Sequence, residues 1–306
     1  MSATPGARPE TVAVAVVTYN RADLLRGMLA GLAALTRAPD AVIVVDNAST
    51  DHTAEVLAAS DLVGLQVIRS ETNVGGAGGF RAAVKEAHDR GFDRIWLMDD
   101  DVVPAPDCLA VLMSYDEDCL MAVREDRAGA LVEKSALRFD LTRARAVKPK
   151  TAMVETTYLT RAAMPATVEL ENVAFEGFMV RRSVVAEIGL PDASFFIFYD
   201  DVDYAIRARR AGRRILAVRD AVLVRQLDFD QQHDLGGWKG FYMYRNLFAV
   251  HLRYGESPLV RAKPWLIAAG VVALSPVRGG PGEARNVLRA LRAARGMRAL
   301  PADSVE

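Results

Sequence analysis

The alternation of apolar strands with helices is the sequence feature that most constrains the fold. Residues 12–17 (VAVAVV) form an unbroken β-branched run, which is typical of a strand buried on both faces. Shorter runs predict strands at 41–45, 65–68 and 94–98, and helical patterns separate them at 21–35, 51–59 and 76–90. Elements that alternate in this way predict an α/β fold with a parallel, doubly wound sheet and helices on both of its faces.

The second half of the chain is less regular. Residues 130–175 have weak periodicity and predict either a β-rich insertion or a loop that faces an acceptor. Beyond them we expect strands at 174–180 and 214–218 and helices at 182–188 and 202–210. The pattern predicts a catalytic domain over residues 12–255, preceded by a disordered segment, residues 1–11, and followed by a helical segment, residues 256–306.

Composition narrows the class of protein. The 306 residues carry a net charge of −1, which argues against a nucleic-acid-binding protein. Cys108 and Cys119 match no metal or redox spacing, so we expect buried thiols in a reducing compartment. Residues 1–11 lack the apolar core of a signal peptide, and the longest apolar run, residues 265–274, is shorter than a membrane span. The sequence indicates a soluble or peripheral cytoplasmic protein.

Three carboxylates, Asp99, Asp100 and Asp101, follow the strand at 94–98. Ligands of open α/β sheets bind at the carboxyl ends of the strands, where these acids lie. Like charges this close are tolerated where a divalent cation neutralises them, and Mg²⁺ fills its remaining positions with phosphate oxygens and water. The triplet predicts a metal and nucleotide-diphosphate site, with a solvated acidic turn as the alternative.

Two further motifs indicate nucleotide binding. Asp46 ends the strand at 41–45, and a carboxylate accepts hydrogen bonds, as the imide N–H of uracil requires. Ser49 or Asp51 can cap the next helix, which would leave Asp46 free for a ligand. Residues 73–80 (NVGGAGGF) predict a glycine-rich loop that leads into a helix N-terminus and favours anions, or otherwise a plain flexible loop.

Asp200 and Asp201 follow the apolar run at 195–199 (FFIFY). A carboxylate next to such a run can lie in a desolvated pocket, which raises its proton affinity toward that of a useful general base. One of the two acids can instead cap the helix at 202–210.

Together these motifs resemble the inverting family-2 glycosyltransferases with the GT-A fold. The resemblance spans about residues 12–212 and rests on VVTYNR (16–21), VVDNASTD (44–51), NVGG (73–76), DDD (99–101) and DDVDYAIR (200–207). It implies a UDP-sugar donor, Mn²⁺ or Mg²⁺, Asp201 as the catalytic base with Asp200 beside it, and Asp99 and Asp101 as metal ligands. The candidate donor-binding residues are Thr18, Asn20, Asp46, Arg69, Asn73, Gly75, Gly76, Asp99 and Asp100.

Residues 195–212 and 238–246 (WKGFYMYRN) carry a closer resemblance, to the mycobacterial-type galactofuranosyltransferases of cell-wall arabinogalactan synthesis. It implies transfer of galactofuranose from UDP-galactofuranose to a rhamnosyl-GlcNAc polyprenyl diphosphate. Polymerising members of that group bind metal through a histidine in a His-x-x-Trp setting, where this chain has residues 224–227 (VRQL). His233 is the nearest histidine and is either a metal ligand or a surface residue.

Acceptor-binding candidates lie on both sides of the acidic pair. Glu176 precedes it, and Trp238, Tyr242 and Arg245 follow it. Aromatic faces stack on sugars and an arginine can pair with a phosphate, but for at least two of the three aromatic residues Trp238, Tyr242 and Tyr244 a packed helix face is the preferred interpretation.

The segment 256–306 combines an apolar stretch that contains Trp265 with arginines at helical spacing. Residues 239–298 carry eleven Lys and Arg against two acids. An apolar helix beside a basic one is typical of a membrane surface, so we expect peripheral attachment to the inner leaflet of the plasma membrane. A helical pair packed on the catalytic domain is the alternative.

Other functions remain open. A rhamnosyltransferase or another sugar transferase would use the same fold, and a nucleotidyltransferase would also bind nucleotides on an α/β sheet. The latter would require a basic glycine-rich loop after the first strand, where Thr18 to Arg21 contain no glycine. A non-catalytic sugar-binding module would not require both the triplet and Asp201.

Overall fold

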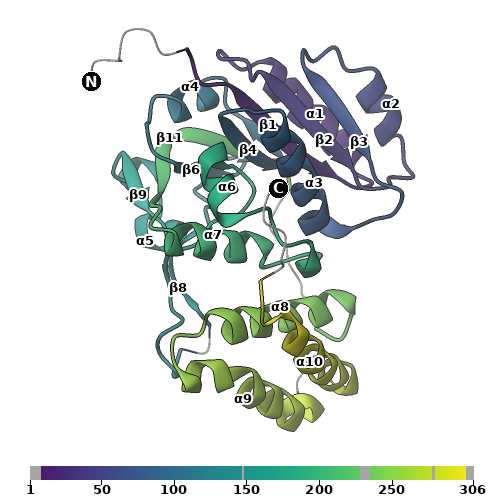
Figure 1. The fold of residues 1–306 in the computed structure, drawn as a ribbon, viewed down its shortest axis with the longest axis vertical. Helices are drawn as coiled ribbons and strands as arrows, with labels where there is room; N and C mark the ends of the chain where they lie inside the picture. Colours follow the sequence, from purple (N-terminus) through teal and green to yellow (C-terminus); the bar gives the residue numbers. More distant parts are fainter. Residues whose placement is uncertain (1–7, 147, 228–234, 278–279, 301–306) are drawn as a thin grey trace.

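The computed structural model describes residues 8–146, 148–227, 235–277 and 280–300. Figure 1 shows two parts: a sheet flanked by helices, and a bundle of long helices at one end of it. Residues 1–7 of the predicted disordered segment 1–11 are not among the residues that the structure describes. Residues 8–11 pack on the sheet, where Arg8 pairs with Asp93 and Glu10 with Arg94.

The N-terminal half forms the parallel part of the sheet, as predicted. Its strands run side by side in the order β3-β2-β1-β4. Thr18 lies opposite Asp46, and Val17 lies opposite Asp99, so the polar ends of three strands meet at one edge. The bounds are β1 Val12–Thr18, β2 Ala41–Asp46, β3 Leu65–Arg69 and β4 Arg94–Asp99.

Antiparallel strands extend this sheet beyond β4. Strand β10 (Phe178–Arg181) runs antiparallel to β4 and to β6 (Cys119–Glu125), and β11 (Ile215–Arg225) runs parallel to β6. Two short strands, β5 (Val102–Pro104) and β9 (Thr167–Glu169), pair antiparallel with β11. The sheet is therefore mixed and keeps the mostly parallel character that the sequence predicted.

Two predicted strand boundaries were wrong. The strand predicted to begin at residue 174 begins at Phe178, because Gly177 has a φ of +114° that extended backbone does not adopt. Strand β11 extends seven residues past the predicted end at 218, and its pairing with β6 shifts between Val218 and Val222.

Alternate residues of β1 face two separate cores, and helices cover both. Val12, Val14 and Val16 pack against α1, α2 and α4, whereas Ala13, Ala15 and Val17 pack toward α3, α6 and α7. Cys108 and Cys119 are free and buried, as expected. The bounds are α1 Ala22–Ala33, α2 Thr53–Ala58, α3 Gly75–Asp89, α4 Cys108–Leu112, α6 Arg182–Ile188 and α7 Asp200–Arg210.

The irregular region between β6 and β10 is a β-rich insertion. Its strands β7 (Ala136–Phe139) and β8 (Lys150–Met153) form an antiparallel hairpin that reaches toward the helical bundle in Figure 1. Helix α5 (Val154–Tyr158) and the 3₁₀ turn η1 (Arg161–Ala163) lead from the hairpin to β9.

Helices α8 (Trp238–Tyr254), α9 (Pro258–Leu274) and α10 (Gly280–Ala294) form the bundle. Their common core also contains Phe195, Val202 and Ile206, which joins the bundle to α7. Short 3₁₀ turns lie at η2 (Ala193–Phe195), η3 (Ser275–Val277) and η4 (Arg295–Met297). Helix α8 precedes the predicted domain boundary at 255/256 yet shares this core, and that division stays a prediction.

Candidate active site

The acidic triplet lies at the carboxyl end of β4, next to the end of β1. Asp100 is 2% exposed and accepts hydrogen bonds from Thr18 Oγ1 (2.8 Å) and Arg21 Nη1 (3.1 Å). Asp101 pairs with the same Arg21 nitrogen at 3.4 Å. Its other oxygen, Oδ1, is buried and has no hydrogen-bond partner among the described residues. One carboxylate oxygen is therefore available to a cation.

The surroundings of the triplet disfavour three ionised carboxylates. Burial raises the pKa of Asp101 to about 6 and the pKa of Asp99 well above its ordinary value, and the charge of Glu176 acts in the same direction on both. Burial also raises the pKa of Asp100. A divalent cation would reverse this, because its charge favours the ionised carboxylates.

The described part of the chain holds no group of three His, Cys, Asp or Glu side chains that could enclose a metal ion. A Mg²⁺-like site requires only one or two carboxylates, because the substrate phosphates complete the coordination, and Oδ1 of Asp101, which has no partner among these residues, fits such a site. Asp99 and Asp101 are the residues that would hold it. His233, the third predicted ligand, lies outside the described residues.

Asp46 is buried, at 1% exposed, and both of its carboxylate oxygens have partners. Oδ1 accepts a hydrogen bond from Ser49 N (2.9 Å) and Oδ2 from Arg69 Nη1 (3.0 Å). The expectation that the neighbouring caps leave Asp46 free was wrong. Asp51 accepts a hydrogen bond from Thr53 N at the start of α2, as expected. Asp46 also binds the turn before that helix, through Ser49 N. A uracil ring would have to share its oxygens with these donors.

Asn20 and Asn73 hold the loops on either side of Asp46. Asn20 has a φ of +52°, and its Oδ1 accepts from Thr50 N (2.7 Å). Asn73 Oδ1 accepts from Gly75 N (2.8 Å) and from the side chain of Asn47 (3.0 Å). Both asparagines therefore organise the strand ends of the candidate donor site.

The helix predicted at 76–90 is confirmed as α3, which takes in all but the first two residues of the glycine-rich segment, so the loop expected there is shorter than predicted. Helix α3 begins at Gly75, and Gly79 packs so closely on Val17 that a Cβ atom would lie 2.6 Å from its Cγ1. Gly75 has a φ of +76°, and a Cβ there would lie 2.1 Å from the carbonyl oxygen of Phe196. Gly76 has open space around its Cα. The glycines allow α3 to approach β1 and residues 195–199.

Asp200 and Asp201 begin helix α7, where negative charges interact favourably with the helix dipole. Asp200 is 8% exposed, and burial together with the charge of Asp201 raises its pKa. Burial raises the pKa of Asp201 to about 6, against the opposing charge of Lys150, which comes from β8. The raised pKa values agree with the predicted desolvated environment, and the pKa of Asp201 suits a general base near neutral pH.

A buried ion-pair network lies between the triplet and Asp201. Arg124 on β6 binds Glu133 (2.7 Å) and Glu176 (2.6 Å), and Arg225 approaches Glu176 at 3.5 Å. The charge of Glu176 acts on Asp99, Asp101 and Asp201 alike. The two predicted halves of the site therefore converge on Glu176, whose contact with an acceptor stays a prediction.

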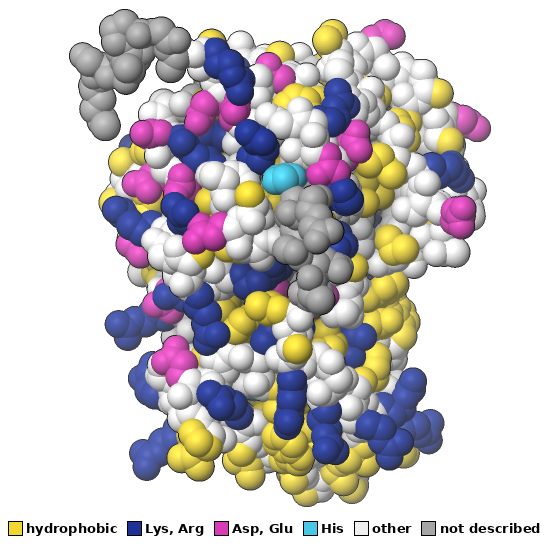
Figure 2. All heavy atoms as spheres, in the orientation of Figure 1, with side chains coloured by type: hydrophobic (Ala, Val, Ile, Leu, Met, Phe, Trp, Pro, Cys, Tyr) yellow, Lys and Arg dark blue, Asp and Glu magenta, His cyan; other side chains and the backbone are white. Residues whose placement is uncertain are grey.

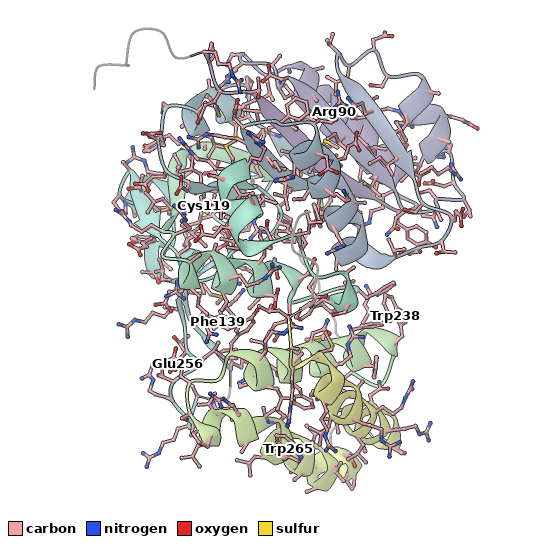
Figure 3. The ribbon with its side chains drawn as sticks, in the orientation of Figure 1. Arg90, Cys119, Phe139, Trp238, Glu256 and Trp265 are labelled. Atoms are coloured by element: carbon pink, nitrogen blue, oxygen red, sulfur yellow. The ribbon has the colours of Figure 1, made fainter. Side chains whose placement is uncertain are left out.

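Trp238, Tyr242 and Arg245 lie along the first turns of α8, and Figure 3 shows Trp238 at its start. The ring of Tyr242 stacks on Phe196 (4.9 Å) and lies under the Arg245 guanidinium (4.6 Å). Arg245 donates hydrogen bonds to the carbonyl oxygens of Ser194 (2.6 Å) and Phe195 (2.8 Å). These contacts favour packing for Tyr242 and Arg245, while Trp238 is 58% exposed and accessible to a sugar.

Several side chains at this site were not among the candidates from the sequence. Arg21 and Asn246 belong to the motifs at 16–21 and 238–246, so the sequence alone could have indicated them. Arg124 and Lys150 come from a strand and a hairpin with no recognisable motif, and only the folded chain brings them to the acidic residues.

The profile of the family described as glycosyltransferase like family 2 matches residues 9–236. The chain therefore belongs to this family and is a glycosyltransferase with the GT-A fold. Among curated proteins it is similar to galactofuranosyltransferase GlfT1 of Mycobacterium tuberculosis, with 31% identity over 84% of this chain and 87% of the relative.

Two solved structures illustrate the shared fold. The mannosyltransferase PcManGT from Pyrobaculum calidifontis, in complex with GDP-Man and Mn²⁺, matches with a TM-score of 0.56 and 22% identity over 98% of this chain and 79% of that one. GalNAc-T7 with UDP, GalNAc and Mn²⁺ matches with a TM-score of 0.61 and 14% identity over 92% of this chain and 54% of that one.

Proposed function

We propose that this glycosyltransferase transfers galactofuranose from UDP-galactofuranose to a rhamnosyl-GlcNAc polyprenyl diphosphate, with inversion at the anomeric carbon, at the start of cell-wall galactan synthesis. The observation that carries the proposal is the pair of acidic groups: the triplet at the end of β4, where Oδ1 of Asp101 has no hydrogen-bond partner among the described residues, and Asp201 at the start of α7. Such a pair would supply a diphosphate-metal site and a base. The choice of sugar is supported by the likeness to GlfT1.

On the donor side, Asp46 and Thr18 face the uridine, and Arg69, Asn20, Asn73, Gly75 and Gly76 shape its surroundings. Asp99 and Asp101 hold Mn²⁺ or Mg²⁺, and Asp100 lies near the sugar. When bound, the cation offsets the negative charge that develops on the departing UDP. The unpartnered Oδ1 of Asp101 and the Mn²⁺ in the solved relatives support this assignment.

On the acceptor side, Asp201 accepts the proton of the attacking hydroxyl group. The hydroxyl oxygen forms a bond to the anomeric carbon as the bond from that carbon to the UDP oxygen breaks, and the electron pair leaves with UDP. Because attack and departure occur on opposite faces, the configuration inverts. A positioned base of this kind contributes about 10²–10⁴-fold to the rate.

The test measures UDP release from UDP-galactofuranose with Mn²⁺, with and without a rhamnosyl acceptor. Acceptor-dependent release is expected, and its absence alongside release from another sugar nucleotide would contradict the donor assignment. Asp201→Asn should lower turnover by about 10²–10⁴-fold while UDP binding, measured by calorimetry, stays unchanged. Asp61→Asn, at an exposed carboxylate after α2, is the control. Turnover of Asp201→Asn near the wild-type value would rule out Asp201 as the base.

The acceptor's lipid places the enzyme at the cytoplasmic face of the plasma membrane. Helix α9 with η3, Pro258–Val277, is long and apolar enough to span a membrane by length and composition, and 28% of its most apolar window is buried. Leu259, Leu266 and Leu274 are exposed on α9, as are Arg285, Arg289, Arg292 and Arg295 on and after α10. Figure 2 shows hydrophobic and basic side chains gathered at this end of the molecule. This arrangement supports peripheral binding to an anionic leaflet.

Co-sedimentation with anionic vesicles tests this surface. Leu266→Ser with Leu274→Ser should reduce the bound fraction, because each side chain contributes apolar area to insertion. Val63→Ser, at a residue that is 87% exposed on the opposite part of the molecule, should leave it unchanged. Equal binding of the double variant and wild type would contradict the membrane assignment.

A further inference from the structure

The loop that leads into the base, residues 195–199, has an unusual backbone. Phe196, Phe198 and Tyr199 all have positive φ values, of 63°, 65° and 68°. This region costs about 1 kcal/mol or more for a bulky L-residue, so three such residues persist only when surrounding contacts impose the conformation. We call residues 195–199 the base loop, because Asp200 and Asp201 follow it directly.

One side chain of α8 provides most of those contacts. The amide nitrogen of Asn246 lies within hydrogen-bond distance of three carbonyl oxygens of the base loop, those of Phe195 (2.9 Å), Ile197 (2.7 Å) and Phe198 (2.8 Å). Its two N–H groups therefore serve three acceptors. Asn246 is fully buried, so water cannot replace it in these bonds.

The orientation of this amide is itself fixed. Arg245 Nε donates to Asn246 Oδ1 at 2.8 Å, which directs the NH₂ group of Asn246 toward the loop. The same arginine binds the carbonyl oxygens of Ser194 and Phe195. Two adjacent residues of α8 thus bind the backbone carbonyl oxygens of residues 194, 195, 197 and 198.

The opposite side of the base loop contacts the donor side. The carbonyl oxygen of Phe196 accepts a hydrogen bond from Ala77 N (3.1 Å) and packs against Gly75 at the start of α3. The base loop is therefore held between α3 and α8. A change in its position would move Asp201 relative to the donor without disturbing the core of the sheet.

We propose that Asn246 is a positioning residue that holds the base loop, and through it Asp201, in the geometry needed for proton transfer. The inference rests on the proposed role of Asp201. Displacement of a reacting group by about 1 Å can cost about 10²-fold in rate, although the displaced residue itself touches no substrate. Asn246 acts on turnover rather than on donor binding.

The chain provides a matched control. Asn286 on α10 is also buried and also presents its amide nitrogen to three backbone carbonyl oxygens, those of Leu235 (3.1 Å), Gly236 (2.8 Å) and Gly237 (2.8 Å). Asn286→Ala removes the same kind of bonds in the same bundle, but from a segment that does not lead into the base.

The experiment compares Asn246→Ala, Asn246→Ser and Asn286→Ala with wild type. Measured quantities are kcat, KM for the donor, UDP affinity by calorimetry, thermal unfolding, and hydrogen exchange of the peptide covering residues 195–203. We expect Asn246→Ala to lower kcat by about 10–100-fold, with UDP affinity within twofold of wild type and faster exchange in that peptide. Asn246→Ser keeps one donor and should recover part of kcat.

Asn286→Ala should lower the unfolding temperature by a similar amount and keep kcat within threefold of wild type. If Asn246→Ala and Asn286→Ala lower kcat equally, or if exchange at 195–203 is unchanged, Asn246 has a general structural role and the inference fails. If Asn246→Ala is too unstable to measure, the same comparison of kcat, UDP affinity and hydrogen exchange is made with Asn246→Ser. Asp201→Asn distinguishes failure of the Asn246 proposal from failure of the proposed function, since full activity in that variant would show that Asp201 is not the base.

Discussion

The two halves of the active site are stabilised in different ways. At the strand-end cluster (Thr18, Asp46, Asp99, Asp100 and Asp101), partners come from nearby strand ends and turns, such as Ser49 N for Asp46 and Thr18 for Asp100. On the base side (Glu133, Glu176, Asp200 and Asp201), Arg124 on β6 pairs with the two glutamates, and Asn246 on α8 binds the backbone of the base loop that leads into the two aspartates.

This difference shows what each half requires of the fold. The strand-end cluster follows from the register of parallel strands, which places Thr18 beside Asp46 and Val17 beside Asp99. The base side depends on ion pairs and hydrogen bonds formed when the insertion and the bundle pack onto the sheet. Substitutions of partner residues should therefore cost more stability on the base side.

A pair of arginine substitutions tests this contrast. Arg124→Met leaves Glu133, which is fully buried, without its counterion, and breaking a buried pair in this way costs about 3–5 kcal/mol. Arg21→Met removes the partner of Asp100, but the Arg21 side chain is 46% exposed, so we expect a loss of about 1 kcal/mol or less. Urea denaturation measures both. Equal losses of stability in the two variants would contradict the difference proposed between the base side and the strand-end cluster.

A pair of glycine substitutions tests the contact between the halves. In Gly75→Ala the new Cβ meets the carbonyl oxygen of Phe196, and the positive φ adds strain. The two effects together should cost about 2–5 kcal/mol. Gly76→Ala meets open space in the first turn of α3 and should be neutral or stabilising by up to about 1 kcal/mol. Thermal unfolding that ranks the two variants in reverse order would contradict this close approach.

The pKa of Asp201, about 6, predicts opposite effects of pH on activity and stability. Protonation removes the base, so kcat should fall about tenfold per pH unit below 6, or about 1.4 kcal/mol in activation free energy. The folded state retains this proton where the unfolded chain has released it. Stability from this group therefore falls as pH rises from its ordinary pKa to about 6.

Asp201→Asn should consequently raise the unfolding temperature at pH 7.5, and this gain should disappear near pH 4. The variant removes the cost of ionising a buried carboxylate, which grows between the ordinary pKa and about 6 and is constant above that. A gain that is constant with pH would show that Asp201 has an ordinary pKa in the folded protein.

The sequence predicted the strand-end cluster because local patterns determine it. A short apolar run, residues 95–98, that ends at Asp99 specifies both the strand and the edge at which the acids lie. The helix at 76–90 was predicted, but the reason for its glycines was not, since glycine weakens isolated helices and only close packing on Val17 explains Gly79 in α3. The late start of β10 depends on the φ of Gly177, which sequence periodicity does not encode.

The base side was only partly predictable for a different reason. The run at 195–199 and the acids after it indicated a desolvated carboxylate, and the structure confirms that environment for Asp201. Arg124, whose charge acts on Asp201, and Asn246, which binds the loop before it, both lie far from Asp201 in the sequence. Single-sequence patterns report neighbours within a strand or helix, so contacts across the fold remained outside their reach.

The smallest expected effect concerns a cap within the strand-end half. Asp51 Oδ1 accepts hydrogen bonds from Thr53 N and Thr53 Oγ1, and Oδ2 accepts from Ala22 N at the start of α1. Asp51→Ala removes a helix cap and should cost about 1 kcal/mol, measured by urea denaturation. Asp61→Ala, at an exposed carboxylate after α2, should cost nothing measurable. A loss at Asp51 as large as that of Arg124→Met would contradict the contrast, because it would mean that the hydrogen bonds of an exposed carboxylate in the strand-end half stabilise the fold as much as the buried ion pair of the base side.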